Sequence, residues 1–300
     1  MLRSRQNPPV DLVEYGCRVL AERLDLDLSG AIEVLAVAAG ERAVFGTSLV
    51  AGSDVVVKVD VAQDRLAREV RALRAAALAG VPVPAVLAMS ADAAEPAAVA
   101  VITRVPGRPL TSTSPDQDWR TVGAHLRRLH DRIPVDGWPP FFLGAEHGWW
   151  ARFRRWAAAE CGDAVADGHL SGAVADLLHR RMSAAFDRDR DPELRFLHGD
   201  CTPYHWLLDA GLVTAAIDFG DAGLGDPAWD LVVLTHWHEH RLPAVLDGYG
   251  ASAVFREQVA GTYDGYRIIR HLGARSWLVG HGVDPAPTIA ELLRLARSPG

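Results

Sequence analysis

The sequence predicts an α+β protein of two lobes, a small antiparallel sheet with helices followed by a larger and mostly helical lobe. Short apolar runs separated by glycine-containing turns fill the first third of the chain, a pattern typical of antiparallel strands. After residue 115 the apolar residues recur at helical spacing instead. The Pro-Gly-Arg-Pro sequence at 106–109 interrupts both patterns, so we expect one lobe at 1–104 and the other at 105–300.

Apolar spacing and turn residues locate the elements of the first lobe. Helical spacing predicts a helix over 9–27 and another over 61–79, and Gly80 with two prolines beyond it ends the second. The strand-like runs are 32–39, 43–50, 54–60, 83–88 and 97–105. The first three runs are so closely spaced that we expect them to pair as an antiparallel meander.

The second lobe is predicted to be helical except around one hairpin. Helical spacing covers 115–131, 147–160, 170–187 and most of 227–297. Between these segments, Trp206–Leu208 and Leu212–Asp218 read as strands joined by an Asp-Ala-Gly turn. A stripe of Trp149, Phe153 and Trp156 is more typical of core packing than of a substrate cleft.

Composition excludes several classes of protein. With 300 residues, 49% hydrophobic and 23% charged, the chain is globular and can bury a core. A net charge of −7 argues against a nucleic-acid partner, which requires a basic surface. The sequence shows neither a secretory signal nor an apolar run of roughly 18 residues that would span a membrane. Three cysteines without metal spacing predict reduced thiols in a cytoplasmic protein.

Lys58 is the only lysine among 31 Lys and Arg residues. It lies in the apolar run 54–60. A compact ammonium group suits a single phosphate oxygen, whereas a guanidinium is a wide planar donor. The lone lysine therefore indicates a phosphate-binding role, with an accident of an arginine-rich composition as the alternative.

Two carboxylates in short motifs flank the predicted hairpin. A His-Gly-Asp tripeptide ends at Asp200, before the hairpin, and an Asp-Phe-Gly tripeptide begins at Asp218, where the hairpin ends. We expect the hairpin to bring the two acids together. Phosphoryl transfer needs one carboxylate to orient and deprotonate a hydroxyl and another to hold a metal on the nucleotide phosphates.

These motifs together resemble the aminoglycoside phosphotransferase and choline kinase family, which shares the protein-kinase-like fold, over nearly the whole chain. The resemblance implies that Lys58 holds phosphates of ATP or GTP and that Glu69 on the next helix pairs with it. It also implies that Asp200 is the catalytic base and that Asp218 is a ligand of Mg²⁺. The family's nucleotide-contacting hinge corresponds to Ile102, Thr103 and Val105.

Each motif by itself has a weaker interpretation. Glu69 lies on an arginine-rich helix and could pair at the surface with Arg65 or Arg68. An isolated His-Gly-Asp or Asp-Phe-Gly is a weak signal. Their order and spacing, followed by a Gly-Asp-Pro-Ala-Trp-Asp sequence that ends at Asp230, favour the family over coincidence.

The position five residues after Asp200 departs from the family, which usually has an asparagine metal ligand there. This chain has His205, its only asparagine is Asn7, and no Gly-x-Gly-x-x-Gly precedes Lys58. Histidine is a poorer ligand for Mg²⁺ than an oxygen donor. Because some antibiotic kinases of the family also have histidine there, the resemblance implies that His205 is the second metal ligand and favours the antibiotic-kinase branch.

The segment 221–264 contains seven acids and two arginines, a net charge of 2 − 7 = −5. Such a segment could attract a cationic small molecule, although a solvated acidic face is the alternative. The candidate acceptor-binding acids are Glu239, Asp247, Glu257 and Asp264. A metal site at His236 and His240 nearby lacks an obvious third ligand, so a partly exposed helix is the preferred interpretation.

The sequence thus predicts a small-molecule O-kinase that transfers the γ-phosphoryl group of ATP or GTP to a hydroxyl of an antibiotic and so confers resistance. An aminoglycoside-like acceptor is favoured, and macrolide or nucleoside antibiotics remain open. One alternative is a metabolic kinase of a sugar or an amino alcohol. Another is a nucleotide-binding pseudokinase that acts as a regulatory module, for which His205 is the only support.

Overall fold

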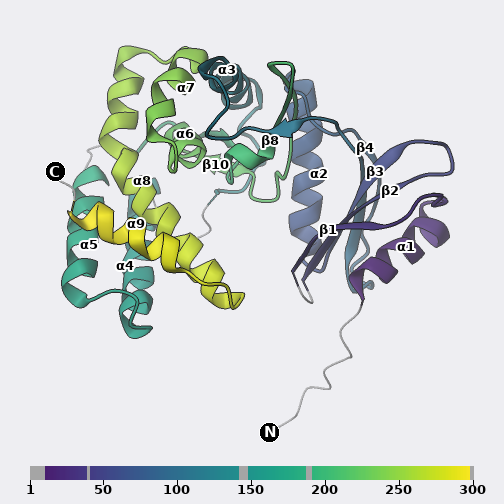
Figure 1. Cartoon of the computed structure of the whole chain (residues 1–300), viewed down its shortest axis with the longest axis horizontal. Helices are drawn as coiled ribbons and strands as arrows, with labels where there is room; N and C mark the ends of the chain where they lie inside the picture. The colour runs from purple at the N-terminus through teal and green to yellow at the C-terminus, as the bar shows by residue number, and fades with distance from the viewer. Residues whose placement is uncertain (1–10, 39–40, 142–147, 187–190, 298–300) are drawn as a thin grey trace, which may run out of the picture. The chain divides into compact units, whose positions relative to one another are not determined.

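The computed structural model describes residues 11–38, 41–141, 148–186 and 191–297 of the chain (Figure 1). The chain divides into two compact units, of which the first comprises Met1–Leu110 with Tyr204–Ala222 and the second Thr111–Pro203 with Gly223–Gly300. The predicted division at 104/105 lies near the first of these boundaries. The hairpin, which the prediction assigned to the second lobe, groups with the first unit instead.

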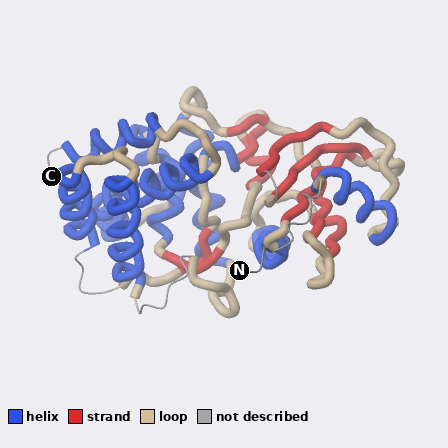
Figure 2. The backbone as a smooth tube through the Cα atoms, turned by 90° about the horizontal axis from the view of Figure 1, so that it is seen from below, coloured by secondary structure: helices blue, strands red, loops and turns tan. Residues whose placement is uncertain are grey.

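A five-stranded antiparallel sheet in the order β1-β2-β3-β5-β4 forms most of the first unit, and Figure 2 shows its strands in red. The strands are β1 (Glu33–Ala38), β2 (Arg42–Ser48), β3 (Asp54–Asp60), β4 (Val86–Ser90) and β5 (Ala98–Thr103). The predicted meander is confirmed as β1-β2-β3. The fourth strand begins later than predicted because Pro82 and Pro84 cannot donate ladder hydrogen bonds.

Two helices pack against opposite faces of this sheet. They are α1 (Leu12–Arg23), which Asp11 caps through its carboxylate, and α2 (Gln63–Leu78). Leu12 and Leu20 of α1 share one core with the β3 residues Val55, Val57 and Val59. Leu66 and Val70 of α2 share another core with Ala98 and Ala100 of β5. Because strand side chains alternate between faces, Lys58 points to the α2 side.

The predicted hairpin is present as β8 (Trp206–Asp209) and β9 (Leu212–Ala216), with the two-residue strand β6 (Arg108–Pro109) beside it. Backbone hydrogen bonds tie it to the N-terminal part of the chain. The N–H of Leu110 donates to Trp206 O at 2.9 Å, and the N–H of Ala216 donates to Pro82 O at 2.8 Å. These bonds explain why the hairpin belongs to the first unit.

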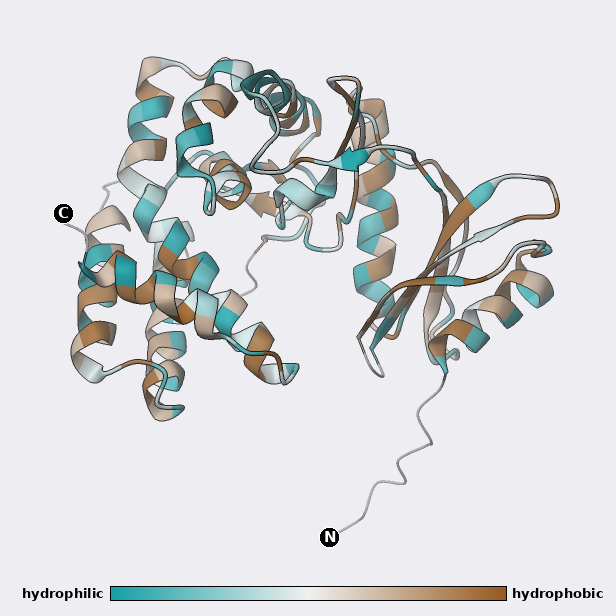
Figure 3. Cartoon of the chain, in the orientation of Figure 1, coloured by the Kyte–Doolittle hydropathy of each residue, from teal (hydrophilic) through white to brown (hydrophobic). Residues whose placement is uncertain are grey.

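The second unit is mostly helical, as predicted. Its helices are α3 (Asp116–Arg132), α4 (Trp149–Ala166), α5 (Gly172–Phe186), α6 (Pro227–Thr235), α7 (Leu242–Tyr249), α8 (Ala253–Gly280) and α9 (Ala286–Arg297). Its other elements are the 3-10 turn η2 (Glu239–Arg241) and the antiparallel pair β7 (Arg195–Leu197) and β10 (Gly223–Gly225). Hydrophilic and hydrophobic residues alternate along α8, as on an amphipathic helix (Figure 3).

The core of the second unit includes part of the predicted aromatic stripe. Trp149 and Phe153 are buried and their rings lie 4.6 Å apart. The Tyr266 ring of α8 lies 5.7 Å from Phe153, whereas Trp156 is half-buried. This stripe is thus mainly packing. No helix among the described residues combines the length and apolar composition that a membrane crossing requires.

Candidate active site

Lys58 forms a buried ion pair with Glu69 of α2. The two residues are 7% and 3% exposed, and Lys58 Nζ also lies 3.1 Å from Asp218 Oδ1. The predicted pairing of this lysine with this glutamate is therefore present. The alternative, in which Glu69 pairs at the surface with neighbouring arginines, does not describe the structure. Two acids and one ammonium group share one site in the first unit.

The charges at this site stabilise one another. Burial by itself would lower the pKa of Lys58, but the carboxylates of Glu69 and Asp218 outweigh burial and raise that pKa. Burial would raise the pKa of Asp218, but the positive charge of Lys58, with contributions from the neighbouring His205 and Arg42, lowers that pKa well below the usual range of a carboxyl group. At neutral pH the lysine is therefore protonated and Asp218 is ionised, the forms that bind phosphate and metal.

Asp218 presents its two carboxylate oxygens to different partners. Oδ1 faces Lys58 and lies 3.6 Å from Arg42 Nη1, whereas Oδ2 lies 3.6 Å from His205 Nε2. The backbone of Asp218 has φ +62°, a region that residues other than glycine seldom adopt and that is enriched at functional sites. We infer that the surrounding structure holds this residue in place for its chemistry.

The donor set of Asp218 and His205 fits a divalent cation. Mg²⁺ is usually held by one or two protein ligands together with phosphate oxygens and waters. A carboxylate oxygen and an imidazole nitrogen 3.6 Å apart can occupy neighbouring positions around one ion. The nitrogen donor also suits Mn²⁺. These two side chains would hold the ion, which would supply positive charge to the nucleotide phosphates.

The predicted hinge residues lie at the end of β5 and just beyond it. Ile102 is buried in the sheet, and Val105 is half-buried after the strand. Thr103 binds Ala85 twice, since its N–H donates to Ala85 O and its hydroxyl accepts from Ala85 N, both at 2.9 Å. This segment is thus fixed to the chain that precedes β4, and its contact with a nucleotide stays a prediction.

Asp200 belongs to the second unit, where it pairs with an arginine of α8. Asp200 Oδ1 lies 2.8 Å from Arg270 Nη2, and the two side chains are 27% and 28% exposed. Gly199 precedes it with φ +89°, a conformation that only glycine adopts without strain. The arginine partner was not predicted, because nothing in the sequence around residue 270 marks it.

The His-Gly-Asp loop is anchored by Asp230 of α6. The fully buried carboxylate of Asp230 accepts from the N–H groups of His198 at 2.7 Å and Gly199 at 3.0 Å. His130 Nε2 lies 3.1 Å from Asp230 Oδ2, and its Nδ1 lies 2.9 Å from the Tyr249 hydroxyl. A carboxylate with these partners holds the backbone before Asp200 in one conformation. The sequence placed Asp230 in a family motif without indicating this role.

Two of the acids predicted to bind a cationic acceptor share one arginine. Arg267 Nη2 lies 2.5 Å from Glu239 Oε1, and its Nη1 lies 3.5 Å from Asp264 Oδ1. Both acids line a cavity of about 590 Å³ that also includes Tyr263. Because Arg267 is almost fully buried between them, these carboxylates are already partly neutralised by the protein itself.

The other two predicted acids lie elsewhere in the second unit. Asp247 of α7 pairs with Arg256, its Oδ1 lying 2.8 Å from Arg256 Nη2. Glu257 is an exposed residue of α8. Three of the four acids are therefore ion-paired with arginines, and their contact with an acceptor stays a prediction.

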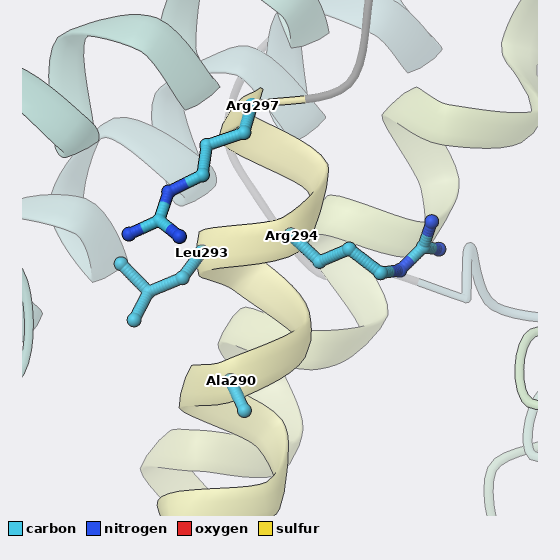
Figure 4. Close-up of a pocket in the computed structure, with 4 residues that line it drawn as sticks. All are labelled: Ala290, Leu293, Arg294 and Arg297. Atoms are coloured by element: carbon cyan, nitrogen blue, oxygen red, sulfur yellow. The ribbon is translucent and has the colours of Figure 1, made fainter.

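Two remaining features lie on the helices of the second unit. The pocket in Figure 4 has a volume of about 500 Å³, and its lining comes from α9, namely Ala290, Leu293, Arg294 and Arg297. Near α6, the Nδ1 atom of His236 lies 2.6 Å from Val233 O. Among the residues that the structure describes, no three His, Cys, Asp or Glu side chains group as a metal site.

The two units together resemble solved antibiotic kinases. The GDP and kanamycin complex of APH(2")-IIia matches with a TM-score of 0.71 and 18% identity, over 95% of this chain and 97% of that one. Macrolide 2'-phosphotransferase MphH from Brachybacterium faecium matches with a TM-score of 0.63 and 19% identity, over 97% and 99%. An aminoglycoside-3'-phosphotransferase of type VIII matches with a TM-score of 0.59 and 26% identity, over 88% and 100%. No curated protein matches the chain.

Residues 35–269 match the phosphotransferase enzyme family. The chain belongs to this family. The predicted protein-kinase-like fold is confirmed, with an antiparallel sheet in the first unit and helices in the second. The protein is accordingly a phosphotransferase with an alcohol group as acceptor.

Three residues that contact or support the predicted site residues were not predicted from the sequence. Arg42 contacts Asp218, Arg270 contacts Asp200, and Asp230 fixes the backbone beside Asp200. The only signal that could have marked one of them is the motif that ends at Asp230. The two arginines are indistinguishable in sequence from the many others in the chain.

Proposed function

We propose that this phosphotransferase transfers the γ-phosphoryl group of ATP or GTP to a hydroxyl of an antibiotic-like small molecule and thereby confers resistance. The observation that carries the proposal is the assembly of Lys58, Glu69 and Asp218 at one buried site. A pseudokinase that only bound nucleotide would also keep these three residues, but it would have no need of Asp200, which this chain retains as a candidate base. This favours an active kinase over a pseudokinase. Because the reaction consumes a cytoplasmic nucleotide, we also propose a cytoplasmic location.

On the first unit, the side chains would bind and orient the nucleotide. Lys58, held by Glu69, would donate to phosphate oxygens, and Ile102, Thr103 and Val105 would border the base. Asp218 and His205 would hold Mg²⁺, which when bound supplies positive charge against the charge that develops on the transferred phosphoryl group. Positioning and charge neutralisation account for most of the catalysis in such transfers.

On the second unit, Asp200 would take the proton of the acceptor hydroxyl. The hydroxyl oxygen forms a bond to the γ-phosphorus, the bond from that phosphorus to the β,γ-bridging oxygen breaks, and ADP or GDP leaves. Asp230 would hold Asp200 in position by fixing the backbone that precedes it. The bound kanamycin in one similar structure, and hygromycin B in another, place aminoglycosides first among the acceptors to test, followed by macrolides and nucleoside antibiotics.

The proposal is tested by expressing the chain in a susceptible bacterium and profiling resistance to these antibiotic classes, with Asp200→Asn as the matched control. Resistance that the control abolishes, together with a phosphorylated antibiotic detected by mass spectrometry, supports the proposal. If purified protein releases ADP or GDP only with a sugar or an amino alcohol, it is a metabolic kinase. If it binds nucleotide but releases none with any acceptor, it is a pseudokinase and the proposal is wrong.

A further inference from the structure

The pairing of Arg270 with Asp200 constrains the acceptor. Arg270 Nη2 lies 2.8 Å from Asp200 Oδ1, and each side chain is about a quarter exposed. A guanidinium stays protonated at every pH at which the protein is folded. The proposed catalytic base therefore has a permanent positive charge beside it, on the second unit's own helix α8.

Two buried nitrogen atoms of consecutive α8 residues have no hydrogen-bond partner among the described residues, namely Arg270 Nε and His271 Nε2. The first belongs to a guanidinium that is 28% exposed, so its other donors can reach a ligand. The His271 ring lies 4.7 Å from the indole of Trp237, which is 50% exposed. An exposed aromatic surface thus adjoins this part of α8, as in sites that hold ring-shaped or aliphatic ligands.

The nearby acids Glu239 and Asp264 do not cancel the positive charge that Arg270 presents to a ligand. Glu239 and Asp264 both contact Arg267, which belongs to the same helix as Arg270. Arg294 of α9 also contacts Glu239, at 2.8 Å. Three of the four acids predicted to attract ammonium groups, Asp247 included, are therefore engaged by arginines, and the fourth is the exposed Glu257.

We propose that the acceptor carries an oxyanion, such as a carboxylate, close to the hydroxyl that is phosphorylated, and that Arg270 binds it. This inference rests on the proposed kinase function of Asp200. The guanidinium, which is 28% exposed, would hold Asp200 through Nη2 and offer the accessible part of its fork to the acceptor oxyanion, since an arginine has donors on three nitrogens. An ammonium group in the same place would meet a fixed like charge, so this inference ranks polycationic aminoglycosides, which the similar structures put first for testing, below acceptors that carry an oxyanion.

The test uses three probes that share a vicinal diol, namely glycerate, glycerol and aminopropanediol. The third group on that diol is an anionic carboxylate, a neutral hydroxymethyl and a cationic aminomethyl group, respectively. Their dissociation constants are measured by isothermal titration calorimetry in the presence of nucleotide, and kcat/KM by ADP or GDP release. We expect glycerate to bind roughly tenfold or more tighter than aminopropanediol. Arg270→Gln should reduce that ratio by about tenfold, whereas Arg270→Lys should preserve its direction because it keeps the charge.

Arg241→Gln is the matched control, because Arg241 is also a partly buried arginine that contacts a carboxylate, Asp116, in the second unit. It should leave the charge preference unchanged. Equal binding of glycerate and aminopropanediol, tighter binding of aminopropanediol, no binding of glycerate, or an unchanged ratio in Arg270→Gln overturns the inference. If Arg270→Gln does not fold, Arg270→Lys decides, since a reversed preference in that variant overturns it equally.

The two proposals fail in different ways. A charge preference in binding, with no phosphoryl transfer to these probes or to any antibiotic class named above, sinks the kinase function and leaves the oxyanion site standing. Transfer that favours ammonium-bearing acceptors sinks the oxyanion site and leaves the kinase function standing.

Discussion

Lys58 Nζ lies 3.1 Å from Asp218 Oδ1, although 160 residues separate the two in the chain. The contact joins β3 to the second residue after β9, and it forms because the hairpin is hydrogen-bonded to the N-terminal part of the protein. Lys58 and Asp218 therefore belong to one compact unit. Nucleotide binding and metal binding are expected to respond to the same substitutions here.

Replacement of Lys58 by arginine should raise the KM for nucleotide by at least about tenfold while the protein stays folded. An arginine can still pair with Glu69, but its planar fork does not fit where one ammonium contacts two carboxylates and, in the proposed function, would also bind a phosphate. Steady-state kinetics with ATP and GTP measure the effect. Arg74→Lys, an exposed change on α2, is the matched control. A normal nucleotide KM in Lys58→Arg would show that the lone lysine is an accident of composition.

Asp200→Asn and Asp218→Asn should separate catalysis from nucleotide binding. Loss of the base at Asp200 should lower kcat by roughly 10²–10⁴-fold with little change in nucleotide affinity. Loss of the carboxylate at Asp218 should instead abolish the Mg²⁺-dependent part of nucleotide binding. Calorimetric titration of each variant with and without Mg²⁺ distinguishes them. Equal losses of nucleotide affinity in both would contradict the separate roles.

His205→Asn should keep substantial Mg²⁺-dependent activity, because an amide oxygen is a good ligand for this ion. His205→Ala should lose most activity, since Asp218 would be left as the only predicted protein ligand. The parent should work comparatively better with Mn²⁺ than His205→Asn does, because Mn²⁺ accepts nitrogen more readily. Initial rates in the two metals provide the measurement. Full activity of His205→Ala would exclude a ligand role for this histidine.

Asp230→Asn should weaken both folding and turnover. An amide in place of the carboxylate accepts through one oxygen only, so one of the two N–H groups of His198 and Gly199 loses its partner. A buried unsatisfied N–H costs roughly 1–3 kcal/mol of unfolding free energy. The unfolding free energy measured by urea denaturation and the kcat should both fall, while the nucleotide affinity should stay nearly unchanged. Asp176→Asn, an exposed change on α5, should alter neither.

Stability should fall as the pH drops from 7 to 5, because two buried histidines must stay neutral in the folded state. Burial, and then the arginines of α8, lower the pKa of His236 and of His271 to about 3. The unfolded chain binds these protons near pH 6.5, so the stabilisation is complete above that pH and is lost as the pH falls towards 3. Each histidine should lower the free energy of unfolding by roughly 2 kcal/mol as the pH falls from 7 to 5.

Urea denaturation at a series of pH values tests this prediction. His271→Gln should flatten the loss of stability between pH 7 and pH 5, whereas His281→Gln, at an exposed position, should not. An unchanged slope in His271→Gln would mean that this ring does not need to be neutral in the folded protein.

The sequence alone determined the elements and the family. Periodicity located the helices and strands because local spacing decides which face of each segment is apolar, and those predictions are confirmed within a few residues at most boundaries. The order of Lys58, Asp200 and Asp218 indicated phosphoryl transfer because each residue type suits one step of that chemistry. The predicted turn at Ala39-Gly40 lies outside the described residues.

Only the tertiary structure decided which charges meet. The sequence predicts an acidic segment at 221–264, but in the structure Arg267 pairs with two of its acids, Glu239 and Asp264. Another arginine of α8, Arg270, pairs with Asp200. Thirty arginines look alike in a sequence, and the partner of each depends on contacts between segments far apart in the chain. Coulomb energy depends on distance and burial, which folding sets and composition does not. The charge around Asp200 is therefore set by packing, not by the net charge of a segment.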